Sequence, residues 1–202
     1  MTSPVQRRPS GQHHGDLRNA LERAALELVA EKGPHGFSLN EASRRAGVSV
    51  AAPYKHFADR GALLAALAAN GYREQRERFA AALDAADSPA DQLAAFAADY
   101  VRFAAQEPAL FDVTFYAGLD KTRHPELAAA GDALLETLMP VARALAPDED
   151  AASDLLLRVS AAAHGLAVFL RQGLFGVGGD ALDETADRAA RSAHAIVAGL
   201  GG

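Results

Sequence analysis

The sequence predicts an all-α protein with a small N-terminal three-helix domain and a larger C-terminal helical body. Apolar residues recur at helical spacing along most of the chain, and glycine or proline residues separate the apolar runs. No segment shows the alternation of apolar and polar residues that is typical of a half-buried strand. We therefore expect a disordered tail over residues 1–14, the small domain over 15–62 and the body over 63–202.

The chain opens with a polar segment that contains Pro4 and Pro9 and almost no apolar side chain, which is why a disordered tail is expected there. From Asp16 onward, leucine and alanine residues recur at the spacing of one helix face. Gly33 followed by Pro34 ends this first helix.

The second helix is expected to begin after Ser38. Serine is a favoured N-cap residue, and Glu41 three residues later completes a capping box. Leu39 and Ala42 share one face, so this helix has one buried side. Gly47 follows and can adopt the left-handed conformation that ends a helix.

A third helix is expected over residues 50–57, with Ser49 as its cap. Small side chains at its start can enter the major groove of DNA, while the polar tips of Tyr54 and His56 suit phosphate oxygens. Phe57 is expected to face the core. The residues expected to contact DNA are Ser38, Ser49, Val50, Ala51, Ala52, Tyr54, Lys55, His56 and Arg60.

Pro53 is expected to disturb this third helix. It lacks the N–H group of the first intrahelical bond, and its ring crowds the Ser49 carbonyl. It also biases Ala52 away from helical angles. Either the helix starts late or its first turn is distorted, and each option changes which of residues 50–53 meet the bases.

Asp59 is the expected cap of a long helix over about 59–84 that links the small domain to the body. Arg60 in its first turn lies at the positive end of the helix dipole and is a candidate phosphate ligand. Pro140 is expected to kink or split a later helix. Further body helices are expected to begin at Pro89, Pro108 and Pro125, and to cover about 150–173 and 181–199.

The stretch AGVSVAAPYKHFADRGALL resembles the DNA-binding motif of TetR-family transcriptional regulators. The resemblance implies phosphate contacts for Tyr54, His56 and Arg60. It implies groove contacts for Ser49, Val50, Ala51, Ala52 and Lys55. Three residues depart from the family pattern, namely Asn40, Pro53 and Gly61, and only the proline has a mechanical consequence.

The net charge of −6 is divided unevenly along the chain. Residues 1–60 hold 9 Lys and Arg against 6 Asp and Glu, whereas residues 61–202 hold 11 against 20. A basic N-terminal part suits phosphate binding by this part alone. The absence of cysteine excludes disulfides and thiolate chemistry, and fits a cytoplasmic location. No signal peptide, membrane span or metal-ligand spacing is recognisable, so we expect no membrane partner, no metal and no cofactor.

The body contains a cluster of aromatic residues that either packs as an ordinary core or lines a small-molecule pocket. The resemblance favours an effector pocket. The segment AAHGLAVFL resembles the Trp-His-Gly signature of one group of C-terminal domains in that family, with Ala163 in place of the tryptophan. The expected ligand-binding residues are Tyr100, Phe103, Phe115, Tyr116 and His164.

The last two helices carry alanine and glycine at close spacing, which allows helices to approach one another and favours a homodimer. The function expected from these features is a ligand-responsive repressor of a palindromic operator in double-stranded DNA. The alternative is a helical scaffold protein with a vestigial DNA-binding domain. No phosphate loop, nucleophile elbow or metalloprotease motif supports an enzyme. The sequence identifies neither the effector nor the operator.

Overall fold

The computed structural model describes residues 10–176 and 178–201, and within them it confirms the all-α prediction. The one β feature there is an isolated bridge between Leu174 and Gly176. The α-helices are α1 Ser10–Lys32, α2 Leu39–Arg45, α3 Arg60–Asp84, α4 Pro89–Gln106, α5 Pro108–Tyr116, α6 Pro125–Arg143, α7 Glu149–Arg171 and α8 Gly179–Ala198. The short 3-10 helices are η1 Pro53–Lys55, η2 Lys121–Arg123 and η3 Gly199–Gly201.

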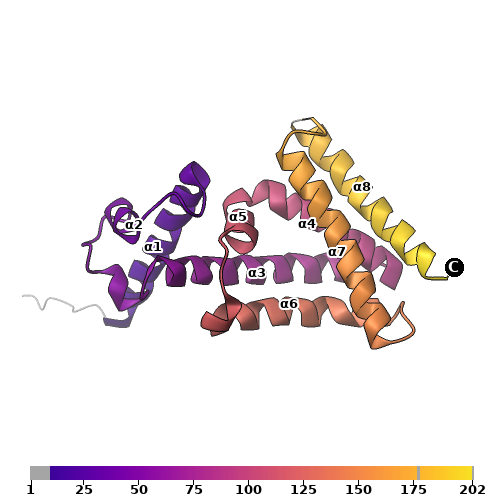
Figure 1. The fold of residues 1–202 in the computed structure, drawn as a ribbon, viewed down its shortest axis with the longest axis horizontal. Helices are drawn as coiled ribbons and strands as arrows, with labels where there is room; N and C mark the ends of the chain where they lie inside the picture. Colours follow the sequence, from indigo (N-terminus) through magenta and orange to yellow (C-terminus); the bar gives the residue numbers. More distant parts are fainter. Residues whose placement is uncertain (1–9, 177, 202) are drawn as a thin grey trace, which may run out of the picture.

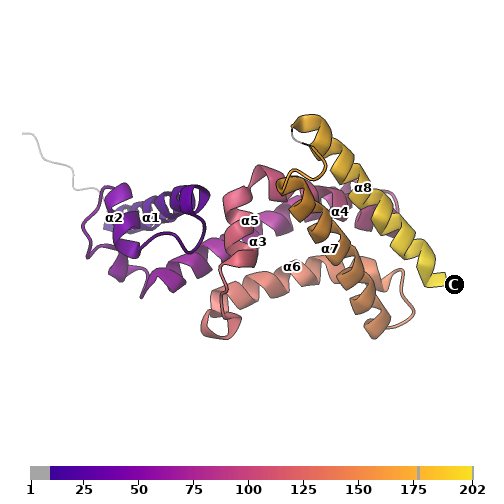
Figure 2. The ribbon, with the colours of Figure 1, turned by 45° about the horizontal axis from the view of Figure 1, so that its top comes forward.

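Two structural units lie at opposite ends of the long helix α3. In Figures 1 and 2, α1 and α2 pack around the first part of α3, and we call this unit the head. Helices α4 to α8 form the body, in which α4, α5 and α6 pack directly against α3. The central body helix is α4, which packs against α3, α7 and α8.

Helix α1 begins at Ser10, six residues earlier than the expected start at Asp16. The first residues of this helix overlap the tail expected over 1–14, and residues 1–9 of that tail lie outside the described residues. No proline interrupts the chain between Pro9 and Pro34, so the helix can extend toward the N-terminus although two glycines lower its propensity.

The two predicted cap residues of α2, Ser38 and Gly47, act as expected, but the predicted capping box is incomplete. The Ser38 side chain accepts a hydrogen bond from the Glu41 N–H at 3.2 Å. The Glu41 carboxylate does not complete the capping box, because it pairs with Lys32 of α1 instead. At the other end, Gly47 has φ of +70° and donates to the Arg44 carbonyl at 3.1 Å. The left-handed glycine sets the direction in which the chain leaves α2.

Replacement of Gly47 by alanine is expected to cost about 1–2 kcal/mol of unfolding free energy, because a Cβ is unfavourable in the left-handed region. Urea denaturation measures this change. The control is Gly179→Ala at the start of α8, where φ is not positive and no described atom lies within 4 Å of an added methyl group. An equal loss in both variants would contradict the role assigned to Gly47.

The core has two clusters of buried side chains. The head cluster contains Leu28, Phe37 and Phe57 and continues along α3 to Val113 of α5 and Leu127 of α6. The body cluster is centred on α4 and includes Phe79 of α3. Because α3 contributes to both clusters, it is the helix that the head and the body share.

Two sequence predictions concern the long helices α3 and α6, namely the cap at Asp59 and the effect of Pro140. The Asp59 carboxylate accepts the Ala62 N–H at 2.8 Å, which confirms the predicted cap of α3. Helix α6 runs through Pro140 to Arg143 without a break, so the expected splitting is wrong. Pro140 lies in the last turn of α6, so only three residues of the helix follow the hydrogen bond that the proline cannot donate.

Candidate nucleic-acid interface and ligand cavities

The segment expected to form the recognition helix is not α-helical. Residues 50–52 form a turn, and the single-turn helix η1 begins at Pro53. Pro53 occupies the first helical position, where its missing N–H group has no cost. Of the two alternatives that the sequence left open, the late start is therefore observed.

Two local predictions in this segment are wrong. Ala52 has helical angles, with φ −64° and ψ −41°, despite preceding a proline. Ser49 does not cap a helix through its side chain; its carbonyl accepts the Ala52 N–H at 3.0 Å. The Pro53 carbonyl in turn accepts hydrogen bonds from His56 and Phe57, both at 2.8 Å. These backbone bonds hold the segment in a compact series of turns.

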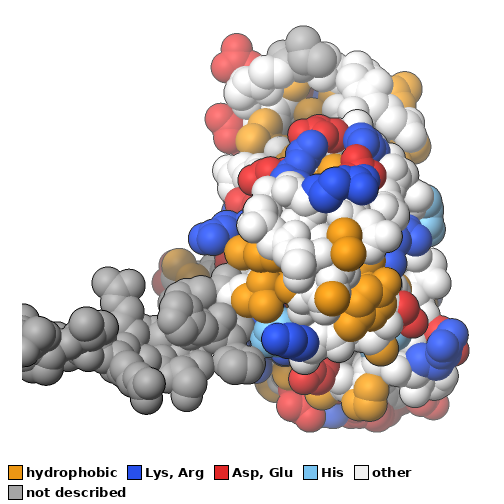
Figure 3. Space-filling view, turned by 90° about the vertical axis from the view of Figure 1, so that its left-hand side faces the viewer, with side chains coloured by type: hydrophobic (Ala, Val, Ile, Leu, Met, Phe, Trp, Pro, Cys, Tyr) orange, Lys and Arg blue, Asp and Glu red, His pale blue; other side chains and the backbone are white. Residues whose placement is uncertain are grey.

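This compact segment presents small and polar side chains to solvent at the end of the head. The exposed fraction is 52% for Val50 and 59% for Tyr54. Ser38, Ser49, Ala51 and Lys55 are also exposed, Ala52 and His56 are half-buried, and Phe57 is buried in the core as predicted. Figure 3 views this end of the molecule and shows hydrophobic side chains gathered between Lys and Arg side chains.

The basic residues of the head differ in their availability for DNA. Arg60 donates a hydrogen bond to the Pro34 carbonyl, and its guanidinium lies 5.4 Å from the centre of the Phe37 ring. Arg45 forms hydrogen bonds to the Glu31 carboxylate at 2.5 and 2.8 Å. Lys55 is exposed and forms no ion pair within the described part of the chain. Of the basic side chains predicted to contact DNA, Lys55 is thus the more available, because Arg60 is already engaged.

Arg44 is a candidate that the sequence interpretation did not include. It is exposed at the last turn of α2 and has no ion-pair partner among the described residues. Its carbonyl accepts the Gly47 N–H, so its backbone is fixed by the turn that leads to Val50. Its position three residues before the turn glycine Gly47 was the available sequence signal.

In the body, three of the five expected ligand-binding residues pack around a fourth, His164 of α7. The Tyr100 hydroxyl is hydrogen-bonded to Nδ1 of His164 at 2.9 Å. The ring centres of Phe115 and Tyr116 lie 5.2 and 6.4 Å from that of His164. Phe103 is fully buried beneath the Arg78 guanidinium, 5.7 Å from its ring centre, and forms no ring contact with His164.

Phe111 is a member of this cluster that was not included in the predicted site. Its ring stacks on His164 with centres 5.5 Å apart and an interplanar angle of 21°. The Arg171 guanidinium lies 4.9 Å from the Phe111 ring centre and forms an ion pair with Asp112 at 2.7 Å. The four-residue spacing between Phe111 and Phe115 on α5 was the signal for this contact.

The rings are packed closely, and the cavities lie beside them. One cavity of about 250 Å³ is lined by Tyr116, Asp112 and Arg171. A second, of about 330 Å³, is lined mainly by apolar residues and also reaches Arg171. Tyr116 is therefore the predicted ligand-binding residue that contacts a cavity, and Arg171 lies at the border of both.

The environment of His164 predicts a dependence of stability on pH. Burial lowers the pKa of His164 below its ordinary value of 6.5. The unfolded chain then binds a proton at this histidine more readily than the folded chain does. The contribution of His164 to the unfolding free energy is therefore complete above pH 6.5 and decreases as the pH falls below 6.5. We expect the unfolding free energy to fall less between pH 7 and 5.5 in His164→Gln than in the wild type, as measured by urea denaturation. An equal decrease in unfolding free energy with pH in the two proteins would contradict a lowered pKa for His164.

Comparisons with known proteins agree with these structural features. Residues 22–67 match the family model described as bacterial regulatory proteins of the tetR family, and residues 93–193 match the tetracyclin repressor-like C-terminal domain. No curated protein matches the chain.

Several solved structures share the fold over nearly the whole chain. A protein of unknown function from Rhodococcus sp. RHA1 is 29% identical, with a TM-score of 0.74, and the match covers 96% of this chain and 100% of that one. The TetR-family regulator PfmR from Thermus thermophilus is 21% identical, with a TM-score of 0.67 and coverages of 87% and 97%. The fatty acid degradation regulator FadR from Bacillus halodurans is 14% identical, with a TM-score of 0.65 and coverages of 96% and 98%.

The fold and the head define a transcription regulator of the helix-turn-helix class, with a helical C-terminal domain. Both parts of the chain match models of one family, and the observed arrangement of head and body is that of its solved members. The chain belongs to the TetR family of transcriptional regulators, whose members bind DNA and form dimers and are not enzymes.

Proposed function

We propose that this protein is a ligand-responsive repressor that binds a palindromic operator as a homodimer. The observation that carries the proposal is the exposed face of the head, where Val50, Tyr54 and Lys55 project from a segment fixed by backbone hydrogen bonds. A rigid, exposed segment of this kind can read base edges while cations beside it bind phosphates. Palindromic DNA requires two such heads about 34–36 Å apart.

The proposed dimer uses the outer faces of α7 and α8. Leu157 and Phe169 on α7 have exposed fractions of 67% and 48%, although both are large apolar side chains. Helix α7 is also long and apolar enough to cross a membrane by composition alone. In a family of soluble DNA-binding regulators, a second copy of the chain accounts better for this apolar face. We accordingly infer a cytoplasmic location and no membrane partner.

The effector is proposed to bind in the body, beside the aromatic cluster. Of the predicted residues, Tyr116 forms part of the wall of one cavity, and Tyr100, Phe115 and His164 pack behind it. Both cavities reach Arg171. Ring stacking and one charged side chain at the border are typical of small-molecule sites. Phe103 would support this wall from the core without contacting the ligand.

A direct contact links the proposed effector site to the head. Nε2 of His35, in the loop between α1 and α2, lies 3.0 Å from the Tyr116 carbonyl at the end of α5. Helix α5 also packs against α3 at Gly71, where an added Cβ would lie 2.5 Å from Oγ1 of Thr114. A ligand that moves the end of α5 therefore acts on the head. It must bind the DNA-incompetent state more tightly to release the operator.

A reporter gene tests the repressor proposal. Its promoter should overlap a duplex that purified protein selects from a random pool. We expect expression of the chain to lower transcription, and expression of Tyr54→Ala to lower it less. Increased transcription would contradict repression. An unchanged signal with wild-type protein, together with no selection of DNA, would instead support the scaffold alternative.

A further inference from the structure

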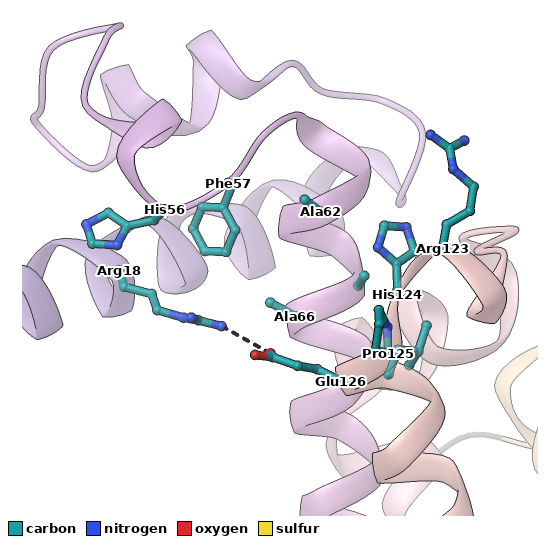
Figure 4. Close-up of a pocket in the computed structure, with 11 residues that line it drawn as sticks. Arg18, His56, Phe57, Ala62, Ala66, Arg123, His124, Pro125 and Glu126 are labelled. Carbon is teal, nitrogen blue, oxygen red and sulfur yellow. Dashed lines mark ion pairs between the residues drawn. The ribbon is translucent and has the colours of Figure 1, made fainter.

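A separate cavity of about 400 Å³ lies at the junction of head and body, away from the aromatic cluster. Figure 4 shows that its walls come from three places: α1, the segment at His56 and Phe57 with the start of α3, and the start of α6. Its volume lies within the range of small-molecule sites. A ligand there would contact the head and the body at once.

One wall of this junction cavity is apolar and belongs to the head. Phe57 has an exposed fraction of 3%, and Ala62 and Ala66 follow on the adjacent turns of α3. The Arg18 guanidinium lies 5.4 Å from the centre of the Phe57 ring. A flat apolar group could therefore lie against this wall with its polar end beside Arg18.

Arg18 has hydrogen-bonding capacity that its protein partners do not use. Its Nε donates to Glu22 at 2.9 Å, and Asn70 donates to the other oxygen of Glu22 at 3.0 Å, which fixes that carboxylate. A terminal nitrogen of Arg18 lies 3.8 Å from Glu126, which is too far for a hydrogen bond. A guanidinium has five N–H donors. In the part of the chain that the structure describes, the terminal nitrogens thus keep donors for an acceptor in the cavity.

The opposite wall also favours negative charge. It contains Arg123, His124 and Pro125, where the 19-residue helix α6 begins. No side chain among the described residues caps this helix start, and the positive end of its dipole lies beside the cavity. Glu126 is the one carboxylate among the lining residues, and Figure 4 shows it directed at Arg18 across the mouth.

We propose that the junction cavity binds a small organic carboxylate, with the carboxylate on the terminal nitrogens of Arg18 and the apolar part against Phe57, Ala62 and Ala66. The ligand carboxylate binds the terminal nitrogen of Arg18 that faces Glu126 at 3.8 Å, and does so at hydrogen-bond distance. This replaces the ion pair between α1 and α6 by a ligand that touches both helices. Because His56 and Phe57 follow directly on η1, occupancy also acts on the DNA-facing segment, and operator binding must act reciprocally on the ligand.

This site is distinct from the effector site proposed in the body. The test of this site needs no DNA. Carboxylate binding at the junction can therefore be disproved while operator binding holds, and operator binding can be disproved while carboxylate binding holds. The compound to titrate into the full-length protein is 2-naphthoate, with the neutral amide 2-naphthamide as its matched comparison and inorganic phosphate as an anion without an apolar part. Calorimetry gives the affinity and the stoichiometry.

Two substitutions with opposite expected effects identify the site. Arg18→Gln should weaken 2-naphthoate binding at least tenfold, because it removes the cation. Glu126→Gln should strengthen binding severalfold, because it removes the competing carboxylate. Arg23→Gln on the exposed side of α1 and Glu136→Gln on α6 are the matched controls and should leave the affinity unchanged. Circular dichroism verifies that each variant folds. If Arg18→Gln is unfolded, the affinity of Glu126→Gln for 2-naphthoate decides the test.

Several outcomes would overturn the proposal. Equal affinity for 2-naphthamide or for inorganic phosphate would show that the site does not recognise an apolar carboxylate. Weakening by Arg171→Gln with no effect of Arg18→Gln would place the compound in the body cavities instead. No change or weaker binding in Glu126→Gln would contradict the competition between Glu126 and the ligand.

Discussion

Replacement of Phe79 by alanine is expected to lower the unfolding free energy by about 3–5 kcal/mol, as is usual for a large aromatic side chain removed from a core. Phe79 is fully buried on α3. Its ring packs edge-on against Phe96 at 4.8 Å and stacks on Tyr100 at 6.1 Å. The variant leaves a void where α3 meets α4, so the contact that fixes the body on α3 is weakened.

Thermal unfolding measures this loss. For a chain of this size each kcal/mol lowers Tm by about 2–4 °C, so a decrease of roughly 6–20 °C is expected at equal protein concentration. Tyr54→Ala is the control, because it makes an aromatic-to-alanine change at an exposed position. A loss below about 1 kcal/mol for Phe79→Ala, or equal losses in the two variants, would mean that the cluster does not hold α3 and α4 together.

Lys55→Gln is expected to weaken operator binding by a factor on the order of 100 or more. A hydrogen bond to a charged group contributes about 1.5–3 kcal/mol, and a dimer loses one such contact in each head. Lys55 is exposed and unpaired in the described residues, so its replacement costs the free protein little stability. If Lys55 binds phosphate, the slope of log affinity against log salt concentration should fall by about 1 for each protomer.

Arg191→Gln provides the control for this charge change, because Arg191 is exposed on α8 in the body. It should leave the salt dependence as in the wild type. If Lys55→Gln lowers affinity for one sequence and not for others, Lys55 reads a base edge instead of a phosphate. Unchanged affinity and salt slope would exclude Lys55 from the interface.

The elements that depend on local signals could be predicted from the sequence. Ser38 and Asp59 cap their helices, and Gly47 adopts the left-handed conformation, because each effect depends on neighbouring residues alone. The helix starts at Pro89, Pro108 and Pro125 agree for the same reason. These signals were sufficient to place the head, the long connecting helix and the body in order.

The DNA-facing segment was harder to predict, because two local signals compete there. Ser49 as a cap favours a helix from Val50, whereas Pro53 cannot donate the hydrogen bond that such a helix needs. The structure resolves the conflict by starting η1 at Pro53. The side chains of Val50 and Tyr54 remain exposed, so these two predicted contact residues stay accessible although their backbone geometry differs from that of a helix.

The cavities could not be predicted, because their walls combine residues that are distant in sequence. The junction cavity brings Arg18, Phe57 and Glu126 together from three elements. In the body, the aromatic residues were recognised as a cluster, but their mutual packing around His164 moves the open volume toward Arg171. Composition and periodicity indicate which side chains are buried, and the distances between helices decide where space remains.

Selection of DNA from a random duplex pool by the purified full-length protein tests the central claim most directly. We expect enrichment of an inverted repeat, followed by a salt dependence that corresponds to roughly six to ten phosphate contacts. Wild-type protein that is folded and dimeric but enriches no sequence at low salt would contradict the assignment of the head as an operator-binding surface.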